Sequence, residues 1–299
     1  MKLAFVVALL AFASAVVAAE KYAAPKLLVE PAELAAAIPS GTFVVLDARP
    51  EADYKKEHAP GARWVDAEAW AKAFGDGEDR QGWSERIGKL GIGADSKVVV
   101  YDDAHAKDAG RMWWILRYWG VADVRLLNGG WKTWKAEKRP ATGDVPQIAP
   151  VAFQPQPNSA RLAKRQDVLD AMKAGREQII DARSEKEFCG LDLGKNKRGG
   201  AIPGAKLLEW SDLIDTKTDR FKSPAELRAI FAKAGIDLNR PTITHCQSGG
   251  RASVMVFGME LLGAAAVRNY YRGWSEWGNR PDTPIVEHGP SVRQVPGKP

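Results

Sequence analysis

The chain has few of the residues that build disulfide frameworks or metal sites. Its 299 residues include two cysteines, Cys189 and Cys246, and four dispersed histidines. Two cysteines exclude a disulfide-rich scaffold, although a single bridge between them stays open. No metal-ligand spacing occurs, so we expect neither a metal nor another cofactor.

Long apolar runs and blocks of one charge are also scarce. Beyond the N-terminus, no segment has the roughly 20 apolar residues that a membrane span needs. The net charge is +6, without a Lys/Arg block or an aromatic-basic ribbon, so we expect small anionic partners and no nucleic acid. Residues 1–19 differ, because Lys2 precedes an apolar stretch that ends in Val17, Ala18 and Ala19. This pattern predicts a signal peptide cleaved after Ala19, and thus a periplasmic or secreted protein without membrane contact after cleavage.

One of the two cysteines stands at the start of a glycine-rich turn. Residues 242–244 have a β-branched strand pattern, and residues 254–262 carry the apolar side chains of a buried helix. The turn between them contains Cys246, Gln247, Ser248, Gly249, Gly250 and Arg251. Two glycines allow several N–H groups to face one point, and the helix N-terminus adds positive potential. The segment therefore predicts a reactive thiolate in an anion-binding loop, with a buried structural cysteine as the alternative.

The two halves of the chain carry the same motifs in the same order. Asp-Ala-Arg occurs at 47–49 and 181–183, Pro-Gly-Ala at 60–62 and 203–205, and Gly-Trp-x-x-Trp at 130–134 and 273–277. Short strands alternate with helical segments in each half, which is typical of a parallel sheet. We expect strands at residues 43–47, 98–101, 124–126, 178–181, 242–245 and 267–270. The predicted fold is α/β, with two domains in tandem, each a parallel sheet flanked by helices.

The repeat also predicts the domain boundaries. We expect a first domain over 24–140, an extended proline-rich linker over 141–160, a second domain over 161–285 and a C-terminal tail over 286–299. The second half carries an insertion at 190–200, which we interpret as a surface loop. Ser223 begins a capping box with proline at the first helical position, and the helix that it opens is expected to end near Gly235.

The first half lacks the thiol. Asp102 stands where Cys246 stands in the second half, so cysteine chemistry is expected in the second half. Arg111 aligns loosely with Arg251, which would make the first-half loop longer. The first half is interpreted as a duplicated domain retained for packing and for shaping a cleft.

Taken together, these motifs resemble the tandem-domain rhodaneses, the thiosulfate and 3-mercaptopyruvate sulfurtransferases, over nearly the whole chain after residue 19. The resemblance implies two rhodanese-like domains, an inactive first one and a catalytic second one, in an exported bacterial protein. The family's His-x-Pro-Gly-Ala motif is present with His58 in the first half, but Ala201 replaces that histidine in the second. The loss of this histidine from the second half weakens the case that a histidine assists the reaction.

The resemblance implies a sulfurtransferase in which Cys246 takes the sulfane sulfur of thiosulfate as a persulfide and passes it to cyanide or a thiol. The acceptors considered include a thiol-redox protein. We expect the N–H groups of residues 247–251 to hold the persulfide, and Arg183 and Arg251 to bind the sulfonate. The full set of expected substrate-binding residues is Arg183, Arg251, Gln247, Ser248, Gly249 and Gly250.

Several alternatives stay open for these residues. Instead of binding substrate, Arg183 could form an ion pair with Asp181 or Glu187. Arg251 could cap its own loop without contacting substrate. His245 is expected to pack within its strand, and Cys189 is expected to be a bystander.

The function has alternatives as well. In the family that the chain resembles, Ser248 and Gly249 match the loops of the 3-mercaptopyruvate enzymes, whereas Arg251 matches the basic loops of the thiosulfate enzymes. We give priority to thiosulfate as the donor. A persulfide carrier with little turnover is a third reading. A cysteine phosphatase is disfavoured, because its loop has five residues between Cys and Arg where this chain has four.

Overall fold

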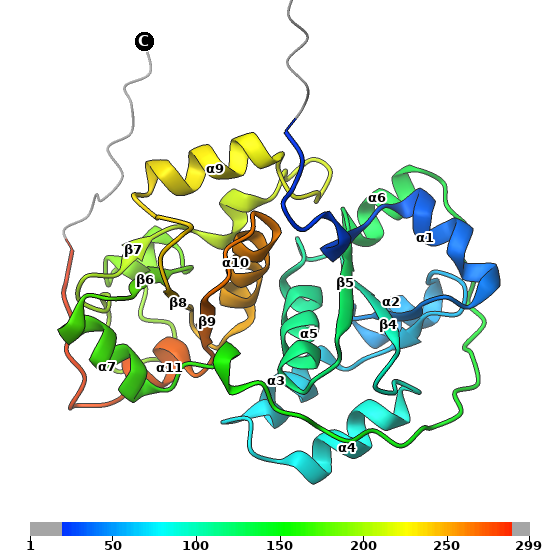
Figure 1. The fold of residues 1–299 in the computed structure, drawn as a ribbon, viewed down its shortest axis with the longest axis horizontal. Helices are drawn as coiled ribbons and strands as arrows, with labels where there is room; N and C mark the ends of the chain where they lie inside the picture. Colours follow the sequence, from blue (N-terminus) through cyan, green and yellow to red (C-terminus); the bar gives the residue numbers. More distant parts are fainter. Residues whose placement is uncertain (1–19, 289–299) are drawn as a thin grey trace, which may run out of the picture.

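The computed structural model describes residues 20–288, so the predicted signal peptide and most of the predicted tail lie outside the described residues. The described chain forms two α/β domains, each built around a parallel sheet (Figure 1). The predicted fold class is confirmed. Among residues 20–288, no helix has both the length and the apolar character that crossing a bilayer requires.

The first domain contains a five-stranded parallel sheet in the order β1-β5-β4-β2-β3. Its strands are β1 (Leu28–Val29), β2 (Val44–Asp47), β3 (Arg63–Trp64), β4 (Lys97–Tyr101) and β5 (Asp123–Leu127). Its helices are α1 (Pro31–Ala37), α2 (Glu51–Lys56), α3 (Ala67–Phe74), α4 (Arg80–Lys89), α5 (Lys107–Tyr118) and α6 (Gly130–Ala136), with 3-10 turns η1 (Pro25–Leu27) and η2 (Ile38–Ser40). The three strands predicted in this half are confirmed.

The second domain contains a four-stranded parallel sheet in the order β7-β6-β8-β9. Its strands are β6 (Gln178–Asp181), β7 (Lys206–Leu207), β8 (Thr242–His245) and β9 (Val267–Tyr270). Its helices are α7 (Arg165–Ala174), α8 (Glu185–Phe188), α9 (Pro224–Lys233), α10 (Gly250–Leu261) and α11 (Gly273–Trp277), with 3-10 turns η3 (Ser159–Arg161) and η4 (Trp210–Leu213). The predicted strands and the Ser223 capping box of α9 are confirmed.

Central strands place the two loops that matter for function. β4 and β8 each lie between two other strands, and their side chains are almost entirely buried. Because both faces of a parallel sheet are covered, the sequences of its central strands consist of apolar or β-branched residues in succession. Asp102 follows the last residue of β4 and Cys246 follows the last residue of β8. Both residues therefore stand at the carboxyl edge of their sheet, where open α/β folds bind ligands.

The segment between the domains is attached to the first domain along its length. The N–H groups of Val151, Gln156 and Asn158 donate to carbonyls of that domain at 3.0, 2.9 and 2.7 Å, and the segment runs past α4 (Figure 1).

At the other end of the second domain, Val286 exchanges two backbone hydrogen bonds with Ala201. The second domain thus continues at least to residue 286, so the tail begins later than predicted.

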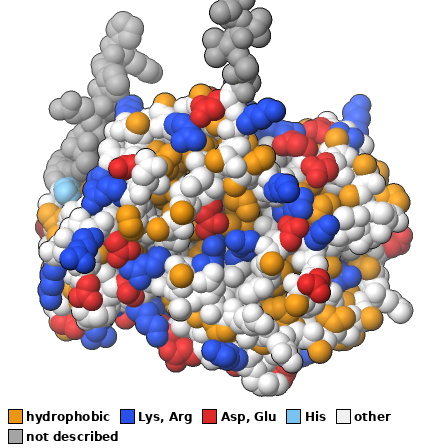
Figure 2. Space-filling view, viewed as in Figure 1, with side chains coloured by type: hydrophobic (Ala, Val, Ile, Leu, Met, Phe, Trp, Pro, Cys, Tyr) orange, Lys and Arg blue, Asp and Glu red, His pale blue; other side chains and the backbone are white. Residues whose placement is uncertain are grey.

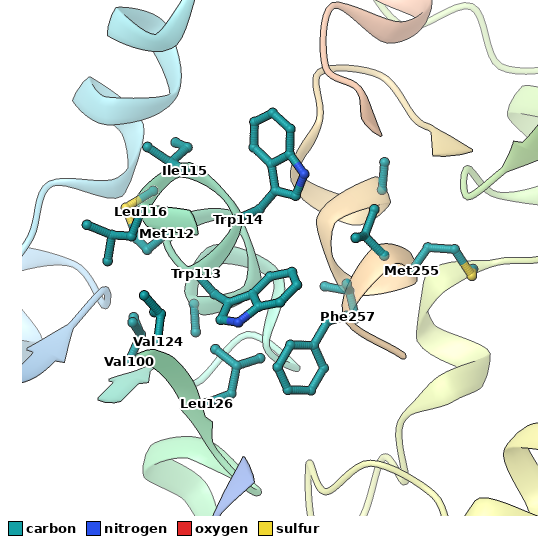
Figure 3. Packing of buried hydrophobic residues seen from close by; sticks show 14 of the residues in the cluster. Val100, Met112, Trp113, Trp114, Ile115, Leu116, Val124, Leu126, Met255 and Phe257 are labelled. Atoms are coloured by element: carbon teal, nitrogen blue, oxygen red, sulfur yellow. The ribbon is translucent and has the colours of Figure 1, made fainter. Parts of the chain in front are cut away.

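The two domains share one hydrophobic core. α5 and α10 lie side by side between the two sheets (Figure 1), and their side chains interdigitate (Figure 3). The rings of Trp113 and Phe257 meet edge to face with centroids 4.9 Å apart. A Cβ on Gly110 would lie 3.1 Å from Val254 Cγ2, so the helix backbones approach closely here. This packing fixes how the start of α5 faces the start of α10.

The bounds of the two helices correct one sequence alignment. α5 and α10 begin and end 143 residues apart (250 − 107 = 143 and 261 − 118 = 143), whereas Asp102 and Cys246 are 144 residues apart (246 − 102 = 144). The loop of the first half is therefore one residue longer, and Asp108 is the counterpart of Arg251. The alignment of Arg111 with Arg251 is wrong.

Candidate active site

Cys246 lies at the bottom of the turn between β8 and α10, with 2% of its surface exposed. Gly249 caps α10 with a left-handed φ of 83°. No disulfide joins Cys246 to Cys189 in the described chain. Cys189 stands at the C-cap of α8 and packs with Phe188 and Ala201. The open possibility of a bridge between the two cysteines is thus not realised.

The turn around Cys246 presents unpaired N–H groups. Across the described residues, the N–H groups of 247–252 donate no hydrogen bond to a backbone carbonyl or a side chain. The first N–H groups of a helix have no acceptor within the helix, and the helix dipole adds positive potential there. This turn is therefore built to bind an anion at or next to the thiol.

The first domain fills the equivalent turn with its own side chain. The Asp102 carboxylate accepts hydrogen bonds from the N–H groups of Ala104 and Ala106 at 3.1 and 3.0 Å, and from those of Asp108 and Ala109 at 2.8 and 2.9 Å. Burial raises the pKa of Asp102 to about 6, while these backbone hydrogen bonds act in the opposite direction. The first domain keeps an anion-binding turn that is closed by an internal carboxylate.

Asp102→Ala is expected to lower the free energy of unfolding by about 2–3 kcal/mol, because four N–H donors lose their buried acceptor. Urea unfolding measures this change. Asp103→Ala is the matched control, since its side chain is exposed and its loss should stay within about 0.5 kcal/mol. Equal stability of the two variants would contradict the assigned role of Asp102.

Two side chains explain why the turn around Cys246 contains consecutive glycines. A Cβ on Gly249 would lie 2.4 Å from the Tyr271 ring, and a Cβ on Gly250 would lie 2.4 Å from Arg111 Nη2. Arg111 belongs to α5 of the first domain. Its Nη1 donates to the Ser248 carbonyl at 2.6 Å and to the Tyr271 hydroxyl at 3.0 Å. Sequence reasoning missed Arg111, which approaches the loop because α5 packs on α10, and Tyr271, which follows β9 of the second domain.

The expected substrate-binding role of Arg183 is corrected by its surroundings. Its guanidinium is 1% exposed, and its Nε and Nη2 donate to the carboxylate of Asp181, with a shortest distance of 2.7 Å. Nη2 also donates to the Gly200 carbonyl, and the guanidinium carbon lies 4.1 Å from the Trp274 ring centroid. A guanidinium enclosed in this way does not offer its planar fork to a sulfonate.

The first domain repeats this arrangement without the thiol. Arg49 pairs with Asp47 at 2.7 Å and lies 4.2 Å from the Trp131 ring centroid. The Asp-Ala-Arg and Gly-Trp-x-x-Trp motifs therefore meet in both halves. Their shared function is to hold the end of β2 or β6 against the last helix of the same domain, α6 or α11.

Arg251 is engaged by an acid of the second domain. Its two terminal nitrogens donate to the two carboxylate oxygens of Glu187 at 2.6 and 2.8 Å. Burial lowers the pKa of Arg251, but the hydrogen bond to Glu187 and the charge on Cys246 outweigh it and raise that pKa. Arg251 therefore stays cationic beside Cys246, although its fork is occupied by Glu187 and not by a substrate as expected.

The remaining loop side chains point in different directions. The Gln247 amide exchanges two hydrogen bonds with the Asn196 amide, at 2.9 and 3.1 Å. Asn196 belongs to the inserted segment 190–200, which is mostly exposed and lies against the loop formed by residues 246–251, the active loop. Ser248 is exposed and lines the cleft described below. The side chain of Gln247 is thus held by Asn196, and only the backbone N–H group of Gln247 is available to bind an anion in the loop.

His245 is buried directly before the thiol, as predicted. Within the described residues, neither ring nitrogen has a hydrogen-bond partner, and Nε2 lies 3.5 Å from Asp181 Oδ2. Burial is the largest cause that lowers the pKa of His245, to about 4, with Asp181 opposing it. The imidazole is therefore neutral at pH 7.

Acidification is expected to destabilise the protein through His245. Its pKa in the folded state is below the unfolded value of 6.5, so the unfolded chain takes up the proton first and stability is lost as pH falls from about 6.5 through 4. A shift of this size corresponds to roughly 3 kcal/mol. Urea unfolding between pH 7 and 4 measures it against His245→Gln, which cannot titrate. The same pH slope in both proteins would contradict this assignment.

A cleft of about 790 Å³ between the domains borders the active loop. Ser248, Tyr271 and Arg272 line it from the second domain, and Arg111 and Lys107 from the first. Basic and acidic side chains are interspersed over the face of the molecule in Figure 2. The cleft is larger than a small inorganic anion requires.

Comparisons with known proteins agree with this geometry. The model of the rhodanese-like domain family matches residues 30–137 and 164–280. The chain is 33% identical over 272 residues to a thiosulfate sulfurtransferase of Azotobacter vinelandii, covering 89% of this chain and 99% of that protein. It is 35% identical over 251 residues to the sulfur carrier protein TtuD of Thermus thermophilus, covering 78% and 87%.

Among solved structures, the crystal structure of the 3-mercaptopyruvate sulfotransferase SseA from Escherichia coli matches with a TM-score of 0.73 and 29% identity. The match covers 84% of this chain and 99% of that one. The chain therefore belongs to the rhodanese family of sulfurtransferases, as a member with two such domains in tandem.

Proposed function

We propose that this protein moves the sulfane sulfur of thiosulfate to a thiophilic acceptor through a persulfide on Cys246. The observation that carries the proposal is the contrast between the two turns. The N–H groups of residues 247–252 have no acceptor within the described chain, whereas the first domain fills its equivalent turn with Asp102. An anionic sulfur on Cys246 is the acceptor that suits these donors.

The reaction has two steps in which atoms and electrons balance. The Cys246 thiolate attacks the outer sulfur of thiosulfate, a new S–S bond forms, and the old S–S bond breaks with its electron pair leaving on sulfite. Cyanide or a thiolate then attacks the outer sulfur of the persulfide. Thiocyanate or a new persulfide leaves, and Cys246 returns as a thiolate. The loop N–H groups and the nearby arginines stabilise the negative charge in both steps.

Two further candidates have an observation in their favour. The structural match to a 3-mercaptopyruvate sulfotransferase favours 3-mercaptopyruvate as donor. The 35% identical relative that is named a sulfur carrier protein favours delivery of persulfide to a protein acceptor, such as a thiol-redox protein. Thiosulfate comes first because relatives at similar identity, including that of Azotobacter vinelandii, are named thiosulfate sulfurtransferases.

The test is the initial rate of sulfite and thiocyanate release from purified protein with thiosulfate and cyanide. The same protein is assayed with 3-mercaptopyruvate and with an aryl phosphate. We expect thiosulfate to give the highest kcat/KM. Faster turnover of 3-mercaptopyruvate would change the donor, formation of a persulfide without turnover would favour the carrier, and phosphate release alone would overturn the proposal.

We also propose export to the periplasm or the medium, which rests on the apolar pattern of residues 1–19. N-terminal sequencing of the protein from a periplasmic extract should give Glu20 as the first residue. Recovery from the cytosol with residues 1–19 still attached would contradict export.

A further inference from the structure

The domain without the thiol reaches the active loop through one side chain. Arg111 projects from the first turns of α5, and its Nη1 donates to the Ser248 carbonyl at 2.6 Å and to the Tyr271 hydroxyl at 3.0 Å. Its guanidinium carbon lies 5.6 Å from the centroid of the Tyr271 ring. The side chain is half-buried and borders the cleft. A cation from one domain is thus fixed on the catalytic turn of the other.

The hydrogen bond to Ser248 fixes the direction of a backbone donor. A trans peptide is planar, so the carbonyl of Ser248 and the N–H of Gly249 point in opposite directions. Arg111 holds that carbonyl toward α5, and the Gly249 N–H therefore points away from α5. Gly249 has φ 83° and ψ −27°. Ser253 and Asn269 hold its own carbonyl, but the preceding Ser248–Gly249 peptide has no other hydrogen bond within residues 20–288. Arg111 supplies the missing restraint.

Arg111 and Arg251 also differ in whether a carboxylate is bound to the guanidinium. The two terminal nitrogens of Arg251 are bound to the Glu187 carboxylate, so its charge is largely compensated. Arg111 forms no ion pair with a carboxylate among residues 20–288, and its hydrogen bonds go to a carbonyl and a phenol. Both guanidinium groups interact with the charge of Cys246. Arg111 thus adds a positive charge at the thiol that no carboxylate of residues 20–288 binds directly, although Asp108 also acts on it.

We infer that Arg111 is a positioning residue of the active loop, through which the domain without the thiol orients the cradle around Cys246 and stabilises its anionic sulfur. The inference rests on the proposed function for the identity of the reaction. It gives the inactive domain a part in catalysis beyond packing. It also explains why Gly250 has no side chain, since a Cβ there would displace the Arg111 guanidinium.

The experiment measures the alkylation of Cys246 by iodoacetamide, alongside kcat and KM for thiosulfate with cyanide. Arg111→Met removes the charge and both hydrogen bonds. We expect alkylation to slow about tenfold and kcat/KM to fall about ten- to hundredfold, the scale of a lost charge-assisted hydrogen bond. Arg111→Lys should recover more of the alkylation rate than of kcat, because it restores charge better than orientation.

Two further variants sharpen the test. Arg117→Met is the matched control, since Arg117 lies on the same helix and donates to Ala122 on its own domain. Gly250→Ala keeps Arg111 in the chain but places a Cβ against its guanidinium, and it should shift both readouts in the same direction as Arg111→Met. Gly250→Ala therefore tests the role of Arg111 even if the Arg111→Met protein fails to fold.

The outcomes separate this inference from the proposed function. Arg111→Met and Gly250→Ala proteins that are alkylated and turn over like Arg117→Met would overturn the role of Arg111. A wild-type protein that does not turn over thiosulfate would overturn the proposed function, while slower alkylation of the Arg111 variant would still support the positioning role.

Discussion

Cys246→Ser should reduce thiocyanate formation from thiosulfate and cyanide by roughly 10⁴-fold or more. A serine hydroxyl is not ionised near neutral pH and forms no persulfide, so both steps of the cycle are lost. The N–H groups of the turn remain, yet they have no anionic sulfur to hold. Steady-state thiocyanate release measures the loss.

Cys189→Ser is the matched control for this variant. Cys189 is buried at the end of α8, and the proposed cycle does not use it, so its replacement should leave kcat within about twofold of wild type. A Cys246→Ser protein that keeps more than a tenth of the wild-type rate would contradict the assignment of the nucleophile. A stalled Cys189→Ser protein would indicate that the second thiol resolves the persulfide.

Trp113→Ala should lower the free energy of unfolding by about 3–5 kcal/mol. Trp113 is fully buried between α5 and α10, where its ring meets Phe257 of the other domain (Figure 3) and stacks under Arg161. Because this core belongs to both domains, we expect one cooperative transition for the whole chain. Urea unfolding followed by circular dichroism measures both quantities.

Trp113→Phe is the control for Trp113→Ala. The indole nitrogen has no hydrogen-bond partner in the described chain, so a smaller aromatic ring should cost less than half of the alanine effect. Two separate transitions, with the second unchanged by Trp113→Ala, would show that the domains do not share a folding unit.

Much of the fold could be predicted from the sequence because the strongest signals are local. Strands β2, β4, β6 and β8 carry buried β-branched runs, and α9 carries a capping box, so these elements were predictable. Strands β1, β3 and β7 were missed, since two residues are too few to show a side-chain period. They exist because neighbouring strands complete their hydrogen bonds.

The loop around Cys246 was also predictable, but the contacts of the residues around it were not. Arg183 was assigned to substrate because an arginine after a strand suits an anion, yet the nearest anion is Asp181, two residues earlier. A signal was present in the sequence, since the first half keeps the same motif without the thiol. A motif retained in a half without the chemistry indicates a structural role.

Arg111 illustrates what sequence comparison alone could not reveal. Its partners Ser248 and Tyr271 lie 137 and 160 residues away, and only the packing of α5 on α10 brings them together. The bounds of α5 and α10 show that Asp108, not Arg111, is the counterpart of Arg251. The role of Arg111 thus follows from an interface, and it has no equivalent in the repeat.

The most direct test of the account is the mass of the Cys246 peptide after the protein is treated with thiosulfate and then with cyanide. The account predicts a gain of one sulfur atom on Cys246 with thiosulfate, and its loss with cyanide as one equivalent of thiocyanate appears. An unchanged Cys246 peptide, while sulfite is released or while the sulfur is found on Cys189, would contradict the account.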